Sequence, residues 1–148
     1  MDLDARVRMT FEYFDRVHRE MFAGHPAANP RLTVEVVDPA EVHGVHTMVL
    51  ICPWTVNGLF FPPGDRYLPD ELEIGGRPHP VFPNHLDELG RYGSVNLVAD
   101  VSCLTMAGIA ASLEPVLPWF RDAVRRLYEP ADTVAEPHRR ALLFGKKV

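Results

Sequence analysis

Apolar and polar positions follow two different periods along the chain. Between about Asp4 and Phe22, apolar residues recur every three or four positions, which predicts an amphipathic helix. The apolar stripe consists of Val7, Phe11, Phe14, Val17 and Met21. Gly24 and Pro26 follow, and we expect the helix to end there because glycine accepts a left-handed cap and proline cannot continue the helical hydrogen bonds.

From residue 31 onward the period changes to two, which is typical of strands. Alternation over Leu32–Val36 predicts a half-buried strand, and the runs Val45–Ile51 and Val56–Phe61 are rich in β-branched and aromatic residues. The segment between these two runs contains Pro53, which has no amide hydrogen and must lie at an edge, a bulge or a turn. One bent strand and a tight hairpin both fit this pattern.

The second half of the chain predicts a surface excursion over 62–80, where turn-forming residues are dense, with a short strand near Val81–Phe82. A strand over 92–101, helices over 105–113 and from Pro115 to about Leu127, and a last short strand over 139–145 complete the order. This order predicts a single α+β domain spanning 1–148, with an antiparallel β-sheet packed against an N-terminal and a C-terminal helix.

Composition narrows the classes of function. The 148 residues are 47% hydrophobic and 24% charged, as in a globular domain, and the formal net charge of −5 argues against nucleic-acid binding. No apolar run approaches the roughly 20 residues of a membrane span, so we expect no membrane insertion. The first residues, MDLDARVR, do not resemble a secretory signal, which predicts a cytoplasmic protein. The oligomeric state stays open.

Candidate catalytic and metal-binding residues are sparse. His43 and His46 are three positions apart, which on a strand sends their side chains to opposite faces, so we expect exposed loop histidines and no metal site. Cys52 and Cys103 both lie in apolar stretches and are expected to be buried, reduced thiols. No nucleophile motif or phosphate-binding loop occurs. We therefore expect no enzyme activity, no catalytic residues and no cofactor.

Aromatic and apolar residues cluster around prolines at Pro53-Trp54, Phe60–Pro63, Tyr67–Pro69 and 80–83. Each single aromatic residue could serve the core, but several together on turn-rich ground are typical of a peptide-binding surface.

Three segments resemble the HybE/HupJ family of [NiFe]-hydrogenase assembly chaperones. They are the run from Val49 to Pro62, the segment Gly90–Ser94 and the segment from His138 to Lys147. They occur in the family's order, and the N-terminal helix that leads to Asn29-Pro30 is similar too, so the resemblance spans almost the whole chain. The chain departs from the family pattern at Val95, where the family commonly has a cysteine.

The resemblance implies an accessory chaperone that binds precursors of the large or small hydrogenase subunit, including the twin-arginine signal of the small subunit. A client would dock near Trp54, with two arginines at the rim. The predicted partner-binding residues are Pro53, Trp54, Asn57, Phe60, Pro62, Tyr92, Arg139 and Arg140. Two alternatives are a small metal-delivery or redox-protective factor and an unrelated α+β domain that binds a small ligand.

Overall fold

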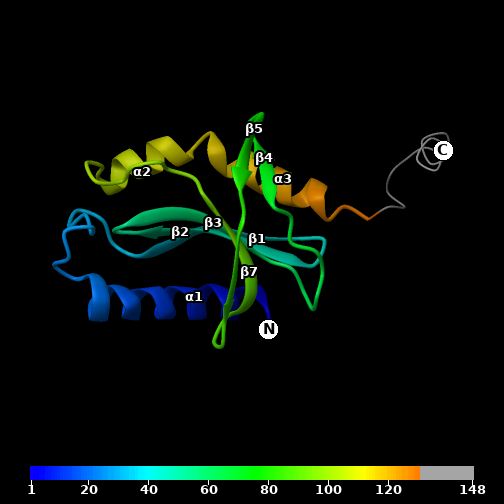
Figure 1. Ribbon diagram of the computed structural model, residues 1–148, viewed down its shortest axis with the longest axis horizontal. Helices are drawn as coiled ribbons and strands as arrows, with labels where there is room; N and C mark the ends of the chain where they lie inside the picture. The colour runs from blue at the N-terminus through cyan, green and yellow to red at the C-terminus, as the bar shows by residue number, and fades with distance from the viewer. Residues whose placement is uncertain (131–148) are drawn as a thin grey trace.

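The computed structural model describes residues 1–130. In chain order its elements are α1 (Leu3–Val17), the π-helical turn η1 (His18–Phe22), β1 (Glu35–Val42), β2 (Val45–Cys52), β3 (Thr55–Phe61), β4 (Glu71–Ile74), β5 (Arg77–Pro80), β6 (Phe82–Leu86), β7 (Gly90–Asn96), α2 (Met106–Leu113) and α3 (Val116–Leu127). The sheet lies between α1 on one face and α2 with α3 on the other (Figure 1).

The main sheet has five strands in the order β1-β2-β3-β7-β6, and all neighbours are antiparallel. β2 and β3 pair from Cys52↔Thr55 to His46↔Phe61, so the turn between them holds only Pro53 and Trp54. The bent-strand alternative is therefore wrong and the hairpin is confirmed. β4 and β5 form a separate hairpin that packs on α3. The predicted α+β class, with an antiparallel sheet between terminal helices, is confirmed.

Strand β2 forms the centre of the core, because all eight of its residues are buried. Residues on one face, including Val49 and Ile51, join the apolar cluster beneath α2 and α3. Residues on the other face, including Met48 and Leu50, join the cluster beneath α1. A strand that is apolar on both faces requires cover on both, and the helices supply it.

Two strand glycines allow aromatic rings to lie directly on the sheet. A Cβ on Gly58 of β3 would lie 2.7 Å from ring carbons of Phe120 on α3, and a Cβ on Gly93 of β7 would lie 2.6 Å from the Phe60 ring. Phe60 and Phe120 are both fully buried. Glycine is needed at both positions because no other residue leaves room for the rings.

The buried face of α1 differs from the predicted stripe. Phe11 is 39% exposed and Met21 is 68% exposed, whereas Thr10 is fully buried. Its hydroxyl donates a hydrogen bond to the carbonyl oxygen of Arg6 at 2.7 Å, so its polar group is satisfied inside the helix. Val7 and Phe14 pack on the sheet as predicted. A threonine with an internal partner can replace a large apolar residue at a buried position.

Several strands begin or end at residues other than the predicted ones. Leu32 and Val34 are buried as the alternation predicted, but strand pairing starts only at Glu35. The excursion over 62–80 contains the hairpin β4–β5, whose Leu72 and Ile74 belong to the core. The strand predicted over 92–101 runs from Gly90 to Asn96. The strand predicted over 139–145 lies outside the described residues.

A glycine-to-alanine pair tests the packing of rings on the sheet. Gly58→Ala should lower the free energy of unfolding by about 1–3 kcal/mol, because the new methyl group overlaps the Phe120 ring. Gly108→Ala in α2 is the matched control: its nearest neighbour would be a Leu104 methyl group at 3.4 Å, so we expect a gain of up to about 1 kcal/mol. Urea unfolding measures both. An unchanged midpoint for Gly58→Ala would contradict the packing.

Candidate partner-binding site

The turn between β2 and β3 places Trp54 against the C-terminal end of α1. Its indole ring stacks on Phe22, with ring centroids 4.1 Å apart and planes 11° from parallel. The His18 ring is also nearly parallel to the indole, with centroids 6.1 Å apart. Trp54 is half-buried, so part of its ring remains available at the surface. The three side chains form the aromatic stack, a rigid arrangement because each ring limits the rotamers of the next.

The aromatic stack includes both ends of the π-helical turn that follows α1. The amide of Ala23 donates to the carbonyl oxygen of His18, five residues earlier, at 2.8 Å. This turn is wider than an α-helical turn, and His18 and Phe22, four positions apart on it, both face the same indole. The periodicity of the sequence predicts a regular helix here and does not reveal the wider turn.

Asn29 fixes the loop that follows α1 beside this turn. Its backbone amide donates to the carbonyl oxygen of Pro53 at 2.8 Å. Its side-chain nitrogen donates to the carbonyl oxygens of Val101 and Leu104, both at 2.7 Å. Its side-chain oxygen accepts from the amide of Arg31 at 2.9 Å. One buried residue thus joins its own loop to two segments that are distant in the sequence, the turn at Pro53 through its backbone and the segment 101–104 through its side chain.

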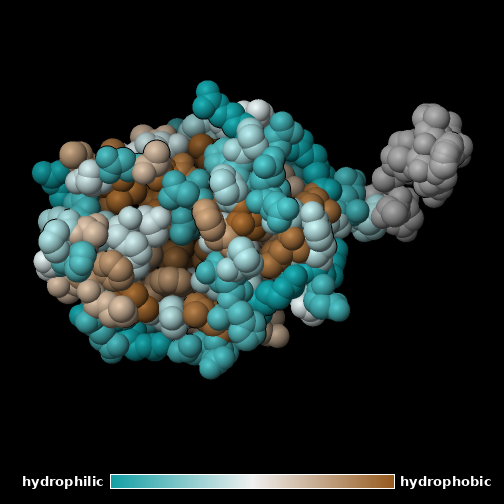
Figure 2. Space-filling view, viewed as in Figure 1, coloured by the Kyte–Doolittle hydropathy of each residue, from teal (hydrophilic) through white to brown (hydrophobic). Residues whose placement is uncertain are grey.

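A cavity of about 430 Å³ opens beside the aromatic stack. It is lined by His18, Ala23, Gly24, His25, Ala28, Pro30 and Leu32. The Nδ1 atom of His18 is buried and has no hydrogen-bond partner within residues 1–130. Figure 2 shows apolar residues between α2 and α1 toward the end of the molecule where α1 finishes and β2 turns into β3. This end combines apolar surface, a cavity and a fixed aromatic ring.

The structure brings three of the predicted partner-binding residues together at this end. Pro53 and Trp54 form the turn, and Asn57 lies at the start of β3, where its side-chain oxygen accepts from the side-chain nitrogen of Asn96 at 3.3 Å. Pro53 itself is buried, so Trp54 and Asn57 supply the accessible surface.

The other predicted residues lie elsewhere. Phe60 has no exposed surface and Tyr92 is 4% exposed, and they belong to the clusters on opposite faces of the sheet. Buried side chains of this kind support the fold and present no surface in this conformation. Pro62 lies at the far end of β3, roughly 20 Å along the strand from the turn. Arg139 and Arg140 lie outside the described residues.

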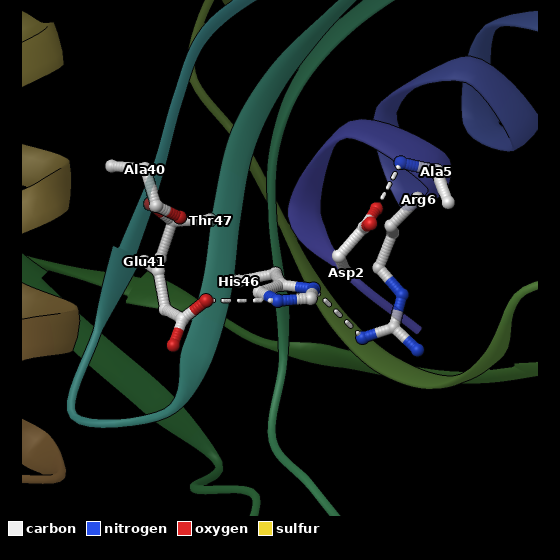
Figure 3. A network of polar contacts seen from close by, with 7 residues as sticks. All are labelled: Asp2, Ala5, Arg6, Ala40, Glu41, His46 and Thr47. Carbon is white, nitrogen blue, oxygen red and sulfur yellow. Dashed lines mark hydrogen bonds and ion pairs between the residues drawn. The ribbon is translucent and has the colours of Figure 1, made fainter.

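Pro62 lines a second cleft, which sequence reasoning did not identify. There the Nδ1 atom of His46 is 3.3 Å from Nη1 of Arg6, and its Nε2 atom is 3.3 Å from Glu41 Oε1 (Figure 3). His46 is 7% exposed, so the expectation of an exposed loop histidine is wrong for this residue. β2 alternates faces, and His46 falls on the same face as Met48 and Leu50, toward α1.

The two thiols have different environments. Cys52 is buried, and burial raises its pKa to about 12 because the thiolate would lose its hydration. Cys103 is exposed, so the expectation that both thiols are buried is wrong. Within residues 1–130, no three histidine, cysteine, aspartate or glutamate side chains gather closely enough to hold a metal ion. In the same part of the chain, every helix is too short or too polar to cross a membrane.

Comparisons with known proteins agree on one family. The family model described as "[NiFe]-hydrogenase assembly, chaperone, HybE" matches residues 5–145. The hydrogenase expression/formation protein HupT of Azotobacter chroococcum mcd 1 is 35% identical over 117 residues, which cover 74% of this chain and 78% of that protein. The hydrogenase expression/formation protein HoxT of Azotobacter vinelandii is 38% identical over 96 residues, which cover 61% of this chain and 63% of that protein. No solved structure matches the chain.

Thiol titration tests the two cysteine environments. At about pH 8, Ellman's reagent should label one thiol of the folded protein quickly and the second only after denaturation, because the reactive species is an accessible thiolate. Cys103→Ser should remove the fast reaction. Fast labelling of both thiols in the folded wild type would contradict the burial of Cys52.

Asparagine variants test how the turn is held. Asn29→Ala should lower the free energy of unfolding by about 2–3 kcal/mol, because the buried hydrogen bond to the Val101 carbonyl and the partly buried bond to the Leu104 carbonyl are both lost. Asn84→Ala is the matched control, since Asn84 also donates two side-chain hydrogen bonds but lies on the edge strand β6, so its loss should cost under about 1 kcal/mol. Chemical denaturation gives both values, and equal losses would show that Asn29 has no special role.

Proposed function

The chain belongs to the HybE family of [NiFe]-hydrogenase assembly chaperones, and from this membership we propose that it binds precursors of the hydrogenase large or small subunit during assembly and releases them unchanged. The family assignment made from the sequence segments is confirmed, and the alternative of a domain unrelated to hydrogenases is wrong. The names of HupT and HoxT, which describe hydrogenase expression or formation, are consistent with such a role.

The aromatic stack supports a docking site at the turn between β2 and β3. Trp54 is held against Phe22 and is only half-buried, so a client can contact a ring that loses little freedom on binding. Tryptophan in a partly enclosed apolar setting is a common centre of binding energy in protein interfaces. Met21, which is largely exposed on the same π-helical turn, adds flexible apolar surface beside it.

We propose the twin-arginine signal of the small-subunit precursor as one client segment. A guanidinium group can stack on an indole face, and the net charge of −5 favours approach of a basic segment. Arg139 and Arg140, proposed as charged contacts at the rim, would meet acidic positions of a client. Acting on precursors before export places the protein in the cytoplasm, and binding followed by release requires no catalytic residue.

Co-purification with matched tryptophan variants tests this proposal. Tagged wild type should recover hydrogenase subunit precursors from the native host, identified by mass spectrometry. Trp54→Ala should bind them roughly 30-fold more weakly, the effect of losing a central aromatic contact of about 2 kcal/mol. Trp119→Ala is the control, because Trp119 is also half-exposed but lies on α3 against the turn between β4 and β5.

A photo-crosslinking residue placed at position 54 or 119 provides a second measurement. Such a residue is large, as tryptophan is, so it should change the stability of the protein less than alanine does. Crosslinks to a precursor from position 54 and none from position 119 would support the site. Equal recovery of precursors by a folded Trp54→Ala protein, together with no crosslink from position 54, would remove the turn from the docking surface.

A further inference from the structure

A polar cleft lies at the end of the sheet opposite the aromatic stack. Its volume is about 460 Å³. It is formed where the first turn of α1, the turn between β1 and β2 and the end of β3 meet, and its lining includes Arg6, Glu41, His46, Phe61, Pro62 and Arg91. These residues lie far apart in the sequence, so only the folded chain creates the cleft.

The guanidinium group of Arg6 has one nitrogen that contacts His46, and no other hydrogen-bond partner among residues 1–130. Nη1 faces Nδ1 of His46 at 3.3 Å, while the carbon of the guanidinium lies 4.6 Å from the centre of the Phe61 ring. Nε is buried and has no hydrogen-bond partner among residues 1–130. In Figure 3 the two remaining nitrogens of Arg6 point away from His46. Because Nε is covered, Nη2 is the nitrogen that can donate a charge-assisted hydrogen bond to an anion in the cleft.

The positive charge of Arg6 has no carboxylate partner in the described part of the chain. Burial lowers the pKa of its guanidinium, because the charged form is removed from water. A partly buried charge without a counter-ion is unfavourable and gains most from an anion that enters the cleft.

His46 and Glu41 hold Arg6 in place without neutralising it. An arginine can only donate, so Nδ1 of His46 must accept from Nη1 and its hydrogen must be on Nε2. That hydrogen faces Glu41 Oε1 at 3.3 Å. Glu41 therefore orients the imidazole from the side opposite Arg6 (Figure 3).

The remaining charges leave the cleft open to an anion. Asp2 caps α1, and its carboxylate accepts from the amide of Ala5 at 2.8 Å. Arg91 donates to the carbonyl oxygens of Gly64 and Arg66, which fixes the loop after β3. These neutral carbonyl groups do not compensate the positive charge of Arg91. Asp2 and Glu41 keep their negative charges in the lining, but neither carboxylate pairs with Arg6 or Arg91, so both arginines lack a direct counter-ion within residues 1–130.

We propose that this cleft binds a carboxylate of a client polypeptide, received by Nη2 of Arg6. The inference rests on the proposed function for the identity of the client, but the carboxylate site itself can be tested without one. The carboxylate can belong to an acidic side chain or to a chain terminus, and the two sources are separated by the choice of probe.

Nuclear magnetic resonance with small probes tests the site. N-acetylglycine carries a terminal carboxylate, N-acetylaspartate α-methylamide carries a side-chain carboxylate, and N-acetylglycinamide is the neutral control. A carboxylate probe should produce a saturable shift of the Arg6 Nε–H signal and of the Gly64 amide, and the neutral amide should produce none. The carboxylate probe that binds more tightly shows whether the site prefers a chain terminus or an acidic side chain.

Arginine variants assign the shift to Arg6. Arg6→Gln should abolish the response of Gly64, and Arg6→Lys, which keeps the charge but not the fork, should weaken it about tenfold. Arg8→Gln is the control, because Arg8 is exposed on the same helix, and its response should equal that of wild type. If Arg6→Gln does not fold, the proposal is tested by the weaker carboxylate binding expected of Arg6→Lys and by the absence of a shift with the neutral amide.

Three results would overturn the proposal: no saturable shift with either carboxylate, an equal shift with the neutral amide, or an undiminished response in Arg6→Gln. Trp54→Ala should bind the carboxylate probe normally, because the aromatic stack is at the other end of the sheet. Failure of the probe with intact recovery of precursors by wild type would therefore remove only the cleft. A normal probe response without recovery of precursors by wild type would remove the proposed function and leave the carboxylate site.

Discussion

Strand β2 has no side that faces solvent, and this constraint organises the rest of the molecule. Because each of its faces is apolar, helices must cover the sheet on both sides, and they come from opposite ends of the chain. Close approach on the α3 side depends on Gly58 and Gly93, which leave room for aromatic rings. On the other side, Thr10 allows α1 to approach because its hydroxyl is satisfied within the helix. The positions of both candidate sites follow from this three-layer arrangement.

The sequence predicts those elements whose local pattern and tertiary environment agree. The strands β2 and β3 follow from two β-branched runs around Pro53, although the same pattern also fits one bent strand, and α1 follows from its helical periodicity. The hairpin β4–β5 was missed because prolines and glycines dominate the segment around it, although Leu72 and Ile74 are buried. The exact buried face of α1 was missed because hydrophobicity alone cannot show that Thr10 has an internal hydrogen-bond partner.

The two candidate sites differ in how far sequence could identify them. Trp54 lies beside a proline between two strands, which is a local signal of an aromatic turn. The contact between Arg6 and His46 joins residues 40 positions apart and has no local signal. Phe60 and Tyr92 were predicted to bind a partner because the sequence does not separate aromatic residues of the core from those of a binding surface, and both are buried. Family membership assigns a role in hydrogenase assembly and leaves the contact surface to be determined from the fold.

The π-helical turn at His18–Phe22 has a consequence for how this chain can vary. Its hydrogen bond from Ala23 to His18 encloses one residue more than an α-helical bond would. Deleting a single residue between His18 and Phe22 would restore an α-helical path and leave the two side chains three positions apart. Their rings would then meet the indole at a different spacing. Insertions and deletions in this short stretch should therefore be selected against more strongly than most exchanges of one side chain for another.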